Sequence, residues 1–155
     1  MPLLRAALSW NFVLATAICA SLLAQLIKVL LNLFIFHRFI AERMWGAGGM
    51  PSSHSATVCA MVVATGRYCG VNSPIFAIAA VLSIIVMYDA MGVRYETGEQ
   101  AKVLNRMFTE WMDQGFEQSQ LPHGKKLKEM VGHTPIEVVT GAALGIVLGF
   151  AMPMV

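Results

Sequence analysis

A short polar segment between two apolar runs has the residue types of an anion-binding site. Residues 48–54 read GGMPSSH. If Pro51 takes the first position of a helix, the amides of Ser52, Ser53 and His54 are unpaired at the positive end of the helix dipole. Such an end binds anions, and two hydroxyls and an imidazole add further donors. We therefore expect an oxyanion site here, for phosphate; the alternative is a serine-capped helix start with His54 on the surface.

A second pair of chemical groups lies in the segment GHTPIEVVTG, residues 132–141. His133 and Glu137 are four residues apart, so one helical face presents both. A carboxylate that accepts the imidazole N–H fixes the tautomer and makes the other ring nitrogen a better nucleophile or base. Thr134 and Glu137 also match a capping box. We expect Glu137 to face either the imidazole or the backbone, so these are alternatives.

The composition indicates a membrane protein. Of the 155 residues, 57% are hydrophobic and 13% are charged, whereas soluble domains have about 25% charged residues. A net charge of +2 is too small to indicate nucleic-acid binding. The three cysteines form no CxxC motif, so we expect neither a zinc site nor a disulfide framework. We also expect no cofactor.

Four apolar runs approach the roughly 20 residues that a membrane-spanning helix needs. They are Leu8–Phe36, Ala56–Val71, Pro74–Met91 and Pro135–Val155. Between the third and fourth runs, Ala101, Leu104 and Phe108 recur at helical spacing, which predicts an amphipathic helix along the membrane surface. The predicted fold is all-α: a single domain, residues 1–155, forming a polytopic membrane helical bundle with about four spans plus a surface amphipathic helix.

Ionisable residues gather at one end of these spans. Four spans place the loops after the first and third runs on one side, and these loops contain most of the basic residues: Arg38, Arg43, Arg94, Lys102, Arg106, Lys125, Lys126 and Lys128. The positive-inside rule assigns that side to the cytoplasm, or to the stroma in an organelle. Four separate segments bring polar groups to this face: Lys28, the PSSH segment, Asp89 with Arg94, and His133 with Glu137. Intramembrane ionisable residues are costly and are functional candidates by default.

These residues resemble a known signature. Lys28, then Pro51 to His54, then His133 with Glu137 four residues later are similar to the three motifs of the type 2 phosphatidic acid phosphatase superfamily, which includes the vanadium-dependent haloperoxidases. The segments GGMPSSHSA, YDAMGVR…GEQA and GHTPIEVVTG resemble its divergent branch, the acid phosphatase/vanadium-dependent haloperoxidase-related family, along nearly the whole chain.

The resemblance implies a metal-independent phosphatase and a role for each residue. His133 is expected to attack phosphorus and form a phosphohistidine, Glu137 to orient it, and His54 to protonate the leaving oxygen. Phosphoryl transfer depends on positioning and on cationic and amide donors around one point. The substrate-binding residues expected from the motifs and their neighbours are Lys28, Ser52, Ser53, Arg94, Asp89 and Lys128.

The sequence departs from the superfamily pattern in ways that leave two functions open. Ser53 replaces a glycine, Glu137 replaces an aspartate, and Leu127 and Ile35 stand where arginines are expected. The first reading is a membrane phosphatase that hydrolyses a lipid or polyprenyl phosphate in the bilayer. The alternative is a non-catalytic membrane protein that binds anionic headgroups or a partner. The two missing arginines favour the alternative, and retention of both histidines favours the enzyme.

Overall fold

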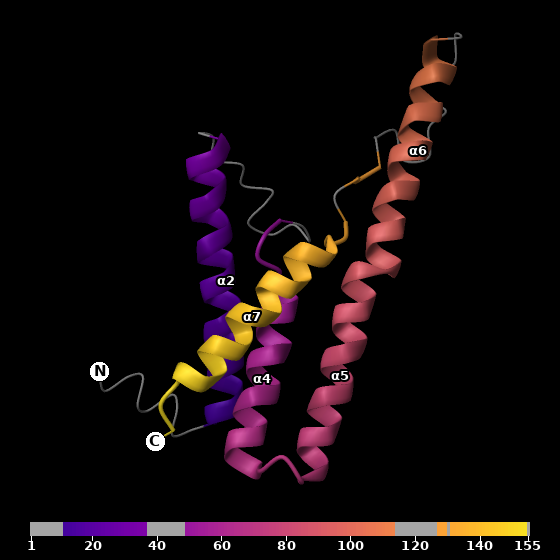
Figure 1. Cartoon of the computed structure of the whole chain (residues 1–155). Helices are drawn as coiled ribbons and strands as arrows, with labels where there is room; N and C mark the ends of the chain where they lie inside the picture. Colours follow the sequence, from indigo (N-terminus) through magenta and orange to yellow (C-terminus); the bar gives the residue numbers. More distant parts are fainter. Residues whose placement is uncertain (1–10, 37–48, 114–126, 130, 155) are drawn as a thin grey trace.

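The structure is a computed structural model that describes residues 11–36, 49–113, 127–129 and 131–154. These residues form five helices, shown in Figure 1: α2 (Phe12–Phe36), α4 (Ser53–Cys69), α5 (Pro74–Met91), α6 (Val93–Asp113) and α7 (Pro135–Ala151). The described residues contain no strand, and the predicted all-α fold is confirmed. The third apolar run coincides with α5, and the second corresponds to α4, which begins three residues earlier than Ala56.

Helix α4 is the centre of the bundle, because it packs against α2, α5 and α7. Its contacts with α7 are made possible by glycine. A Cβ added at Gly141 or Gly145 would lie 2.3 Å from the carbonyl oxygen of Ser52 or Ala56, and one at Gly149 would lie 2.7 Å from the Cβ of Val63. Glycines at every fourth position let two helix backbones approach closely, which is a common form of packing between membrane helices.

The interior of the bundle is built from small and polar residues. Ala20 and Ala24 of α2 pack against Ala56 and Ala60 of α4. The largest fully buried side chains are polar: Lys28, His133, Thr16, Ser52 and Ser55. Large aliphatic side chains instead cover the outside of α2, α5 and α7. This is the distribution expected where hydrocarbon surrounds the protein and helix association relies on close packing.

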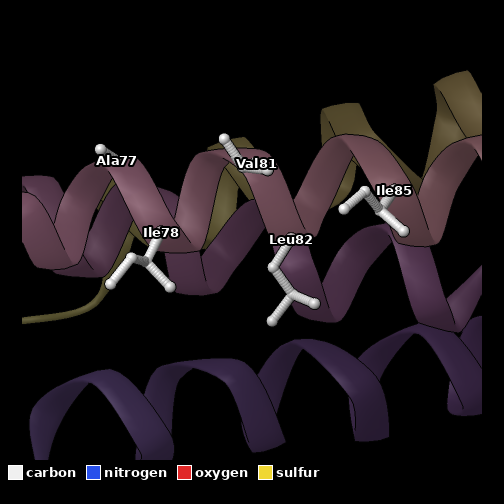
Figure 2. Close-up of a pocket in the computed structure, with 5 residues that line it drawn as sticks. All are labelled: Ala77, Ile78, Val81, Leu82 and Ile85. Carbon is white, nitrogen blue, oxygen red and sulfur yellow. The ribbon is translucent and has the colours of Figure 1, made fainter.

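Two helical segments of the described chain, Phe12–Phe34 and Pro74–Met112, contain a stretch long and apolar enough to cross a membrane. Helix α7 is a shorter apolar helix. The outer face of α5 is apolar throughout the stretch that Figure 2 shows. There a shallow groove of about 390 Å³ is lined by Ala77, Ile78, Val81, Leu82 and Ile85.

The predicted amphipathic helix is present as α6, and it continues the course of α5. Figure 1 shows α6 projecting past the other helices from the end of α5. Only Gly92 separates the two helices, and its N–H still donates to the carbonyl of Tyr88 at 2.8 Å. The Glu96 N–H likewise donates to the carbonyl of Gly92 at 2.9 Å, so the helical hydrogen-bond pattern continues across the junction and α6 runs on from α5, away from the bundle.

The helix directions bring four ends together, as the ionisable residues predicted. The C-terminal half of α2 and the C-terminal end of α5 lie beside the N-terminal ends of α4 and α7. At the opposite end, Phe12 and Ala64 pack with Met152. Arg67 also lies there, and its Nη1 donates to the carbonyls of Gly149, Phe150 and Met152 at 2.6–3.1 Å.

Candidate functional site

His133 lies at the entrance to α7 and is held on two sides. Its backbone N–H donates to the carbonyl of Ala90 at the end of α5, at 3.0 Å. Its Nδ1 is 3.2 Å from Oε2 of Glu137. The imidazole is 1% exposed, and its Nε2 is buried without a hydrogen-bond partner in the described residues. Orphaned buried polar atoms are rare, so this nitrogen marks the His133 ring as a candidate for contact with a ligand.

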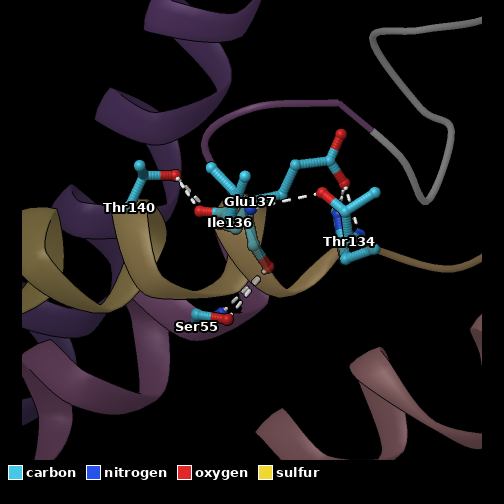
Figure 3. A network of polar contacts seen from close by, with 7 residues as sticks. Ser55, Thr134, Ile136, Glu137 and Thr140 are labelled. Carbon is cyan, nitrogen blue, oxygen red and sulfur yellow. Dashed lines mark hydrogen bonds and ion pairs between the residues drawn. The ribbon is translucent and has the colours of Figure 1, made fainter.

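Glu137 performs both of the roles that were expected to exclude each other, so that expectation was wrong. Its Oε2 accepts a hydrogen bond from the Thr134 N–H at 3.0 Å while it faces His133 Nδ1. The Glu137 N–H in turn donates to Oγ1 of Thr134, which completes the capping box shown in Figure 3. One carboxylate oxygen has two lone pairs, so it can accept from the backbone and from the imidazole at the same time.

His54, one residue into α4, faces His133. The two imidazoles meet edge to face, with ring centroids 5.8 Å apart and an interplanar angle of 64°. His54 is exposed whereas His133 is buried. The side chains of Lys28, Asp89 and Arg94 lie close enough to interact electrostatically with His54. The structure therefore brings groups from α2, α4, α5 and α6 to the mouth of the His133 site.

Lys28 is buried within α2 at 2% exposure. Its aliphatic chain runs beside Gly49, where an added Cβ would lie 3.6–3.8 Å from three of its carbons. Glu137 interacts with it electrostatically. Burial of an ammonium group is costly unless a partner compensates for the lost water. Glu137 is therefore the carboxylate that compensates the buried charge of Lys28.

The start of α4 differs from the prediction by two residues. Pro51 precedes the helix, Ser52 is the N-cap and Ser53 is the first helical residue. The Ser52 N–H donates to the carbonyl of Glu137 at 2.9 Å, and its Oγ accepts from the N–H and hydroxyl of Ser55. The amide of Ser52 is therefore not available for an anion, contrary to expectation. The amides of Ser53 and His54 remain in the first turn, where a helix supplies no acceptor.

The remaining predicted residues are spread around this centre. Arg94 Nε donates to Oδ2 of Asp89 at 2.5 Å, and both side chains are half-exposed. Lys128 is exposed on the segment that precedes His133, and no ion pair or hydrogen bond joins it to either histidine in the described residues. Gly48 and the basic residues Arg38, Arg43, Lys125 and Lys126 lie outside the described residues.

Two residues that position the site were not predicted. Gln25 Nε2 donates to Ser53 Oγ at 3.4 Å, and its Oε1 is buried without a partner in the described residues. Gly141 allows α7 to lie against the backbone of Ser52. The sequence contained a signal for each residue. Gln25 is a polar residue within an apolar run, one turn before Lys28, and Gly141 begins a repeat of glycine at every fourth residue of α7.

Within the described part of the chain, no three His, Cys, Asp or Glu residues are arranged to hold a metal ion. The positive groups of the described site are Lys28, Arg94 and the first-turn amides of α4.

Comparison with known proteins yields two matches. The family model described as "Divergent PAP2 family" matches residues 9–148. The chain is 38% identical over 144 residues to the uncharacterized membrane protein YuiD of Bacillus subtilis (strain 168). The aligned region covers 89% of this chain and 91% of YuiD. No solved structure matches the chain. The matched region contains every candidate residue of the site.

Proposed function

Because this chain belongs to the divergent PAP2 family, we propose that it is a membrane phosphatase that hydrolyses a lipid or polyprenyl phosphate through a phosphohistidine at His133. One observation carries the proposal. Glu137 engages Nδ1 of His133, Nε2 is buried without a partner in the described residues, and His54 lies against the same ring. A headgroup-binding site requires no such pairing of imidazoles.

The geometry supports a two-step transfer. Nε2 of His133 attacks phosphorus, so that a P–N bond forms as the P–O ester bond breaks. The leaving oxygen takes a proton from His54. Water then attacks the phosphohistidine, His54 accepts a proton from that water, and phosphate leaves as the P–N bond breaks. Glu137 stabilises the positive charge that His133 acquires during the attack, as the carboxylate does in other oriented imidazoles.

Positive charge for the phosphoryl oxygens comes from several elements. Lys28 is buried beside Gly49 and Glu137, and Arg94 is held by Asp89 near His54. The first-turn amides of α4 point to the same end of the bundle. We propose that Arg94 replaces the arginine missing at Leu127, because Arg94 lies at the site and the segment containing Leu127 is attached to α6 through Asn105.

We propose that the chain is embedded in the bilayer with this site at headgroup depth on the cytoplasmic face. The relative's name describes a membrane protein, and this chain has two helical segments that can cross a membrane. In the sequence, the basic loops follow the first and third apolar runs, and the positive-inside rule assigns that side to the cytoplasm. A lipid phosphate reaches such a site sideways between helices without leaving the membrane.

A non-catalytic protein that binds anionic headgroups is the second candidate. The observation in its favour is the use of Ser52: both its amide and its hydroxyl are engaged by other protein groups, so one motif residue does not face an anion. In that case the histidines bind phosphate without forming a covalent bond to phosphorus.

Phosphate release separates the two functions. The purified protein is assayed over a panel of lipid and polyprenyl phosphates beside His133→Ala and Glu137→Gln, with Cys69→Ser at the exposed far end of α4 as the control. We expect His133→Ala to abolish release, because no other nucleophile replaces the imidazole. We expect Glu137→Gln to lower release by less than the roughly ten-thousandfold seen for an aspartate-to-asparagine change in a serine protease triad. Release by His133→Ala at the wild-type rate would rule out the phosphohistidine.

A further inference from the structure

The residues that lead to His133 are attached to α6 and to the end of α5. We call residues 127–129 and 131–133 the lead segment. Asn105 binds it at residues 127 and 129, and Tyr95 packs against it at residue 132. His133 itself donates its backbone N–H to the carbonyl of Ala90 at 3.0 Å. The lead segment therefore runs antiparallel to α6, from Asn105 back to the proposed active site.

Asn105 is the main polar anchor of the lead segment. Its Nδ2 donates to the carbonyl of Leu127 at 2.9 Å and to Oε1 of Glu129 at 2.8 Å. Its Oδ1 accepts from the Leu127 N–H at 2.8 Å. Among the described residues, four hydrogen bonds join the lead segment to α5 and α6, and three of them use this side chain. Both amide hydrogens and the carbonyl oxygen are used, so the partners fix the orientation of the amide.

Asn105 occupies a position where an asparagine is costly unless it is bonded. It is 5% exposed, and asparagine is a poorer helix former than alanine or leucine. A buried amide is tolerated when its hydrogen bonds are made. Leu127, which stands where the superfamily pattern has an arginine, supplies its backbone N–H and carbonyl to this amide. The position that lacks the arginine is therefore an attachment point of the lead segment.

Close backbone packing completes the attachment. A Cβ added at Gly98 would lie 2.5 Å from the carbonyl oxygen of Glu129, and one at Gly132 would lie 2.3 Å from the backbone of Tyr95. These contacts set how closely the lead segment lies against α6, but they supply no hydrogen bond. Its register along the helix therefore depends on Asn105 and on the bond from His133 to Ala90. These two anchors are separated by about 22 Å of helix, at about 1.5 Å per residue.

We propose that Asn105 is a positioning residue for the reaction, because by holding the lead segment on α6 it fixes the backbone of His133 beside His54. The inference rests on the proposed phosphatase function. Glu137 holds the His133 ring from within α7, whereas the lead segment holds the His133 backbone from α5 and α6. A displacement of about 1 Å at a reacting group can lower the rate about a hundredfold. Helix α6, which projects from the bundle in Figure 1, thus contributes to the site through the segment it carries.

Exchanging donor and acceptor between positions 105 and 129 tests this role. Asn105→Asp removes both N–H donors and places a second carboxylate against Glu129. Glu129→Gln alone keeps an acceptor for Asn105 and leaves the three hydrogen bonds in place. In the double variant, Asn105→Asp with Glu129→Gln, the glutamine amide donates to the aspartate and one bond is restored. Thr109→Val is the control, because the Thr109 hydroxyl donates to the Asn105 carbonyl within α6 and does not contact the lead segment.

Steady-state kinetics of phosphate release give the first readout. We expect Asn105→Asp to lower kcat about ten- to hundredfold, because His133 is no longer held in place. We expect KM to change by less than about twofold, because Lys28 lies on α2 and keeps its position. The double variant should recover at least about threefold in kcat, which corresponds to one hydrogen bond. Asn105→Ala, which carries no charge, repeats the test if Asn105→Asp yields too little folded protein.

Acylation by diethyl pyrocarbonate gives a second readout that does not depend on turnover. Modified histidine peptides are quantified by mass spectrometry over time. His133 is 1% exposed whereas His54 is exposed, so His54 reacts faster in the wild type. His133 reacts through local opening, and loss of the Asn105 bonds raises the open population about tenfold. We therefore expect faster acylation of His133 in Asn105→Asp, and a slower rate again in the double variant.

The outcomes separate this inference from the proposed function. Faster acylation of His133 that the double variant reverses supports the positioning role, and an absence of phosphate release in the wild type would then contradict the phosphatase alone. Unchanged acylation of His133 in Asn105→Asp and Asn105→Ala overturns the role, even if the wild type releases phosphate. A double variant no better than Asn105→Asp also overturns it, as does an equal fall in kcat in Thr109→Val.

Discussion

Replacing Gly141 with alanine tests how α7 positions the active site. The Cβ of Gly141→Ala would lie 2.3 Å from the Ser52 carbonyl oxygen, and ordinary contact begins at 3.4 Å. The two helices must therefore separate locally by about 1.1 Å, which is the difference between these distances. The same movement strains the 2.9 Å hydrogen bond from the Ser52 N–H to the Glu137 carbonyl. This bond ties the start of α4 to the start of α7.

The expected magnitude follows from two opposing effects. Overpacking of a close interface costs about 1–3 kcal/mol. Alanine regains up to about 1 kcal/mol because it is a better helix former than glycine. The clash is with a backbone oxygen, so we place the overpacking cost in the upper part of its range, at about 2–3 kcal/mol. The net loss is then about 1–2 kcal/mol, and we expect a fall in Tm of about 2–8 °C for a chain of this size. In Gly145→Ala the added Cβ would lie at the same distance, 2.3 Å, from the carbonyl oxygen of Ala56, about 6 Å farther along the helix.

The assay compares Tm and phosphate release in detergent for both variants. Ala143→Leu, on the exposed side of the same helix, adds more volume without meeting α4 and is the control. We expect both glycine variants to lose similar stability, with the larger loss of phosphate release in Gly141→Ala. An unchanged or higher Tm in both would refute the close packing of α4 and α7. Equal loss of release would refute the specific link between Ser52 and Glu137.

Two further substitutions test the two ends of the bundle. Arg67→Gln removes a guanidinium nitrogen that donates to three carbonyls at the end of α7. We expect a loss of about 1–3 kcal/mol of stability, measured as a lower Tm, with KM for the phosphate ester unchanged. A change in KM without a change in Tm would contradict a purely structural role. Lys28→Met keeps the length of a buried side chain and removes its charge. We expect KM for a phosphate ester to rise about ten- to hundredfold, because one charge-assisted hydrogen bond to the phosphate is lost. An unchanged KM would remove Lys28 from the proposed site.

Much of the helical arrangement could be predicted from hydropathy alone. The run Pro74–Met91 matches α5, and Pro135 begins α7 as predicted. Alternating helix direction then implies that the ionisable residues meet at one end. The course of α6 was harder to predict, because an amphipathic pattern shows that a helix has two unlike faces and does not show which way it points. That direction depends on the single-residue connection at Gly92.

Predictions about the site were limited by how side chains share partners. Residue spacing predicted both the capping box and the contact between His133 and Glu137, but we expected only one of the two to form. Whether one carboxylate satisfies both depends on the rotamer of Glu137 and on the backbone of Thr134, which residue spacing does not specify. The position of Pro51 before the helix, and the use of the Ser52 amide by Glu137, similarly depend on the packing of α4 against α7.

Detection of the phosphoenzyme tests the central claim most directly. The purified protein is mixed with a substrate labelled in the phosphoryl group and quenched in base, which preserves a phosphoryl group on histidine, and the labelled peptide is mapped. We predict label on His133 that is acid-labile, absent in His133→Ala, and retained longer in His54→Ala because that variant lacks the group that activates water for the second step. Phosphate release at full rate without label on His133 would contradict the account.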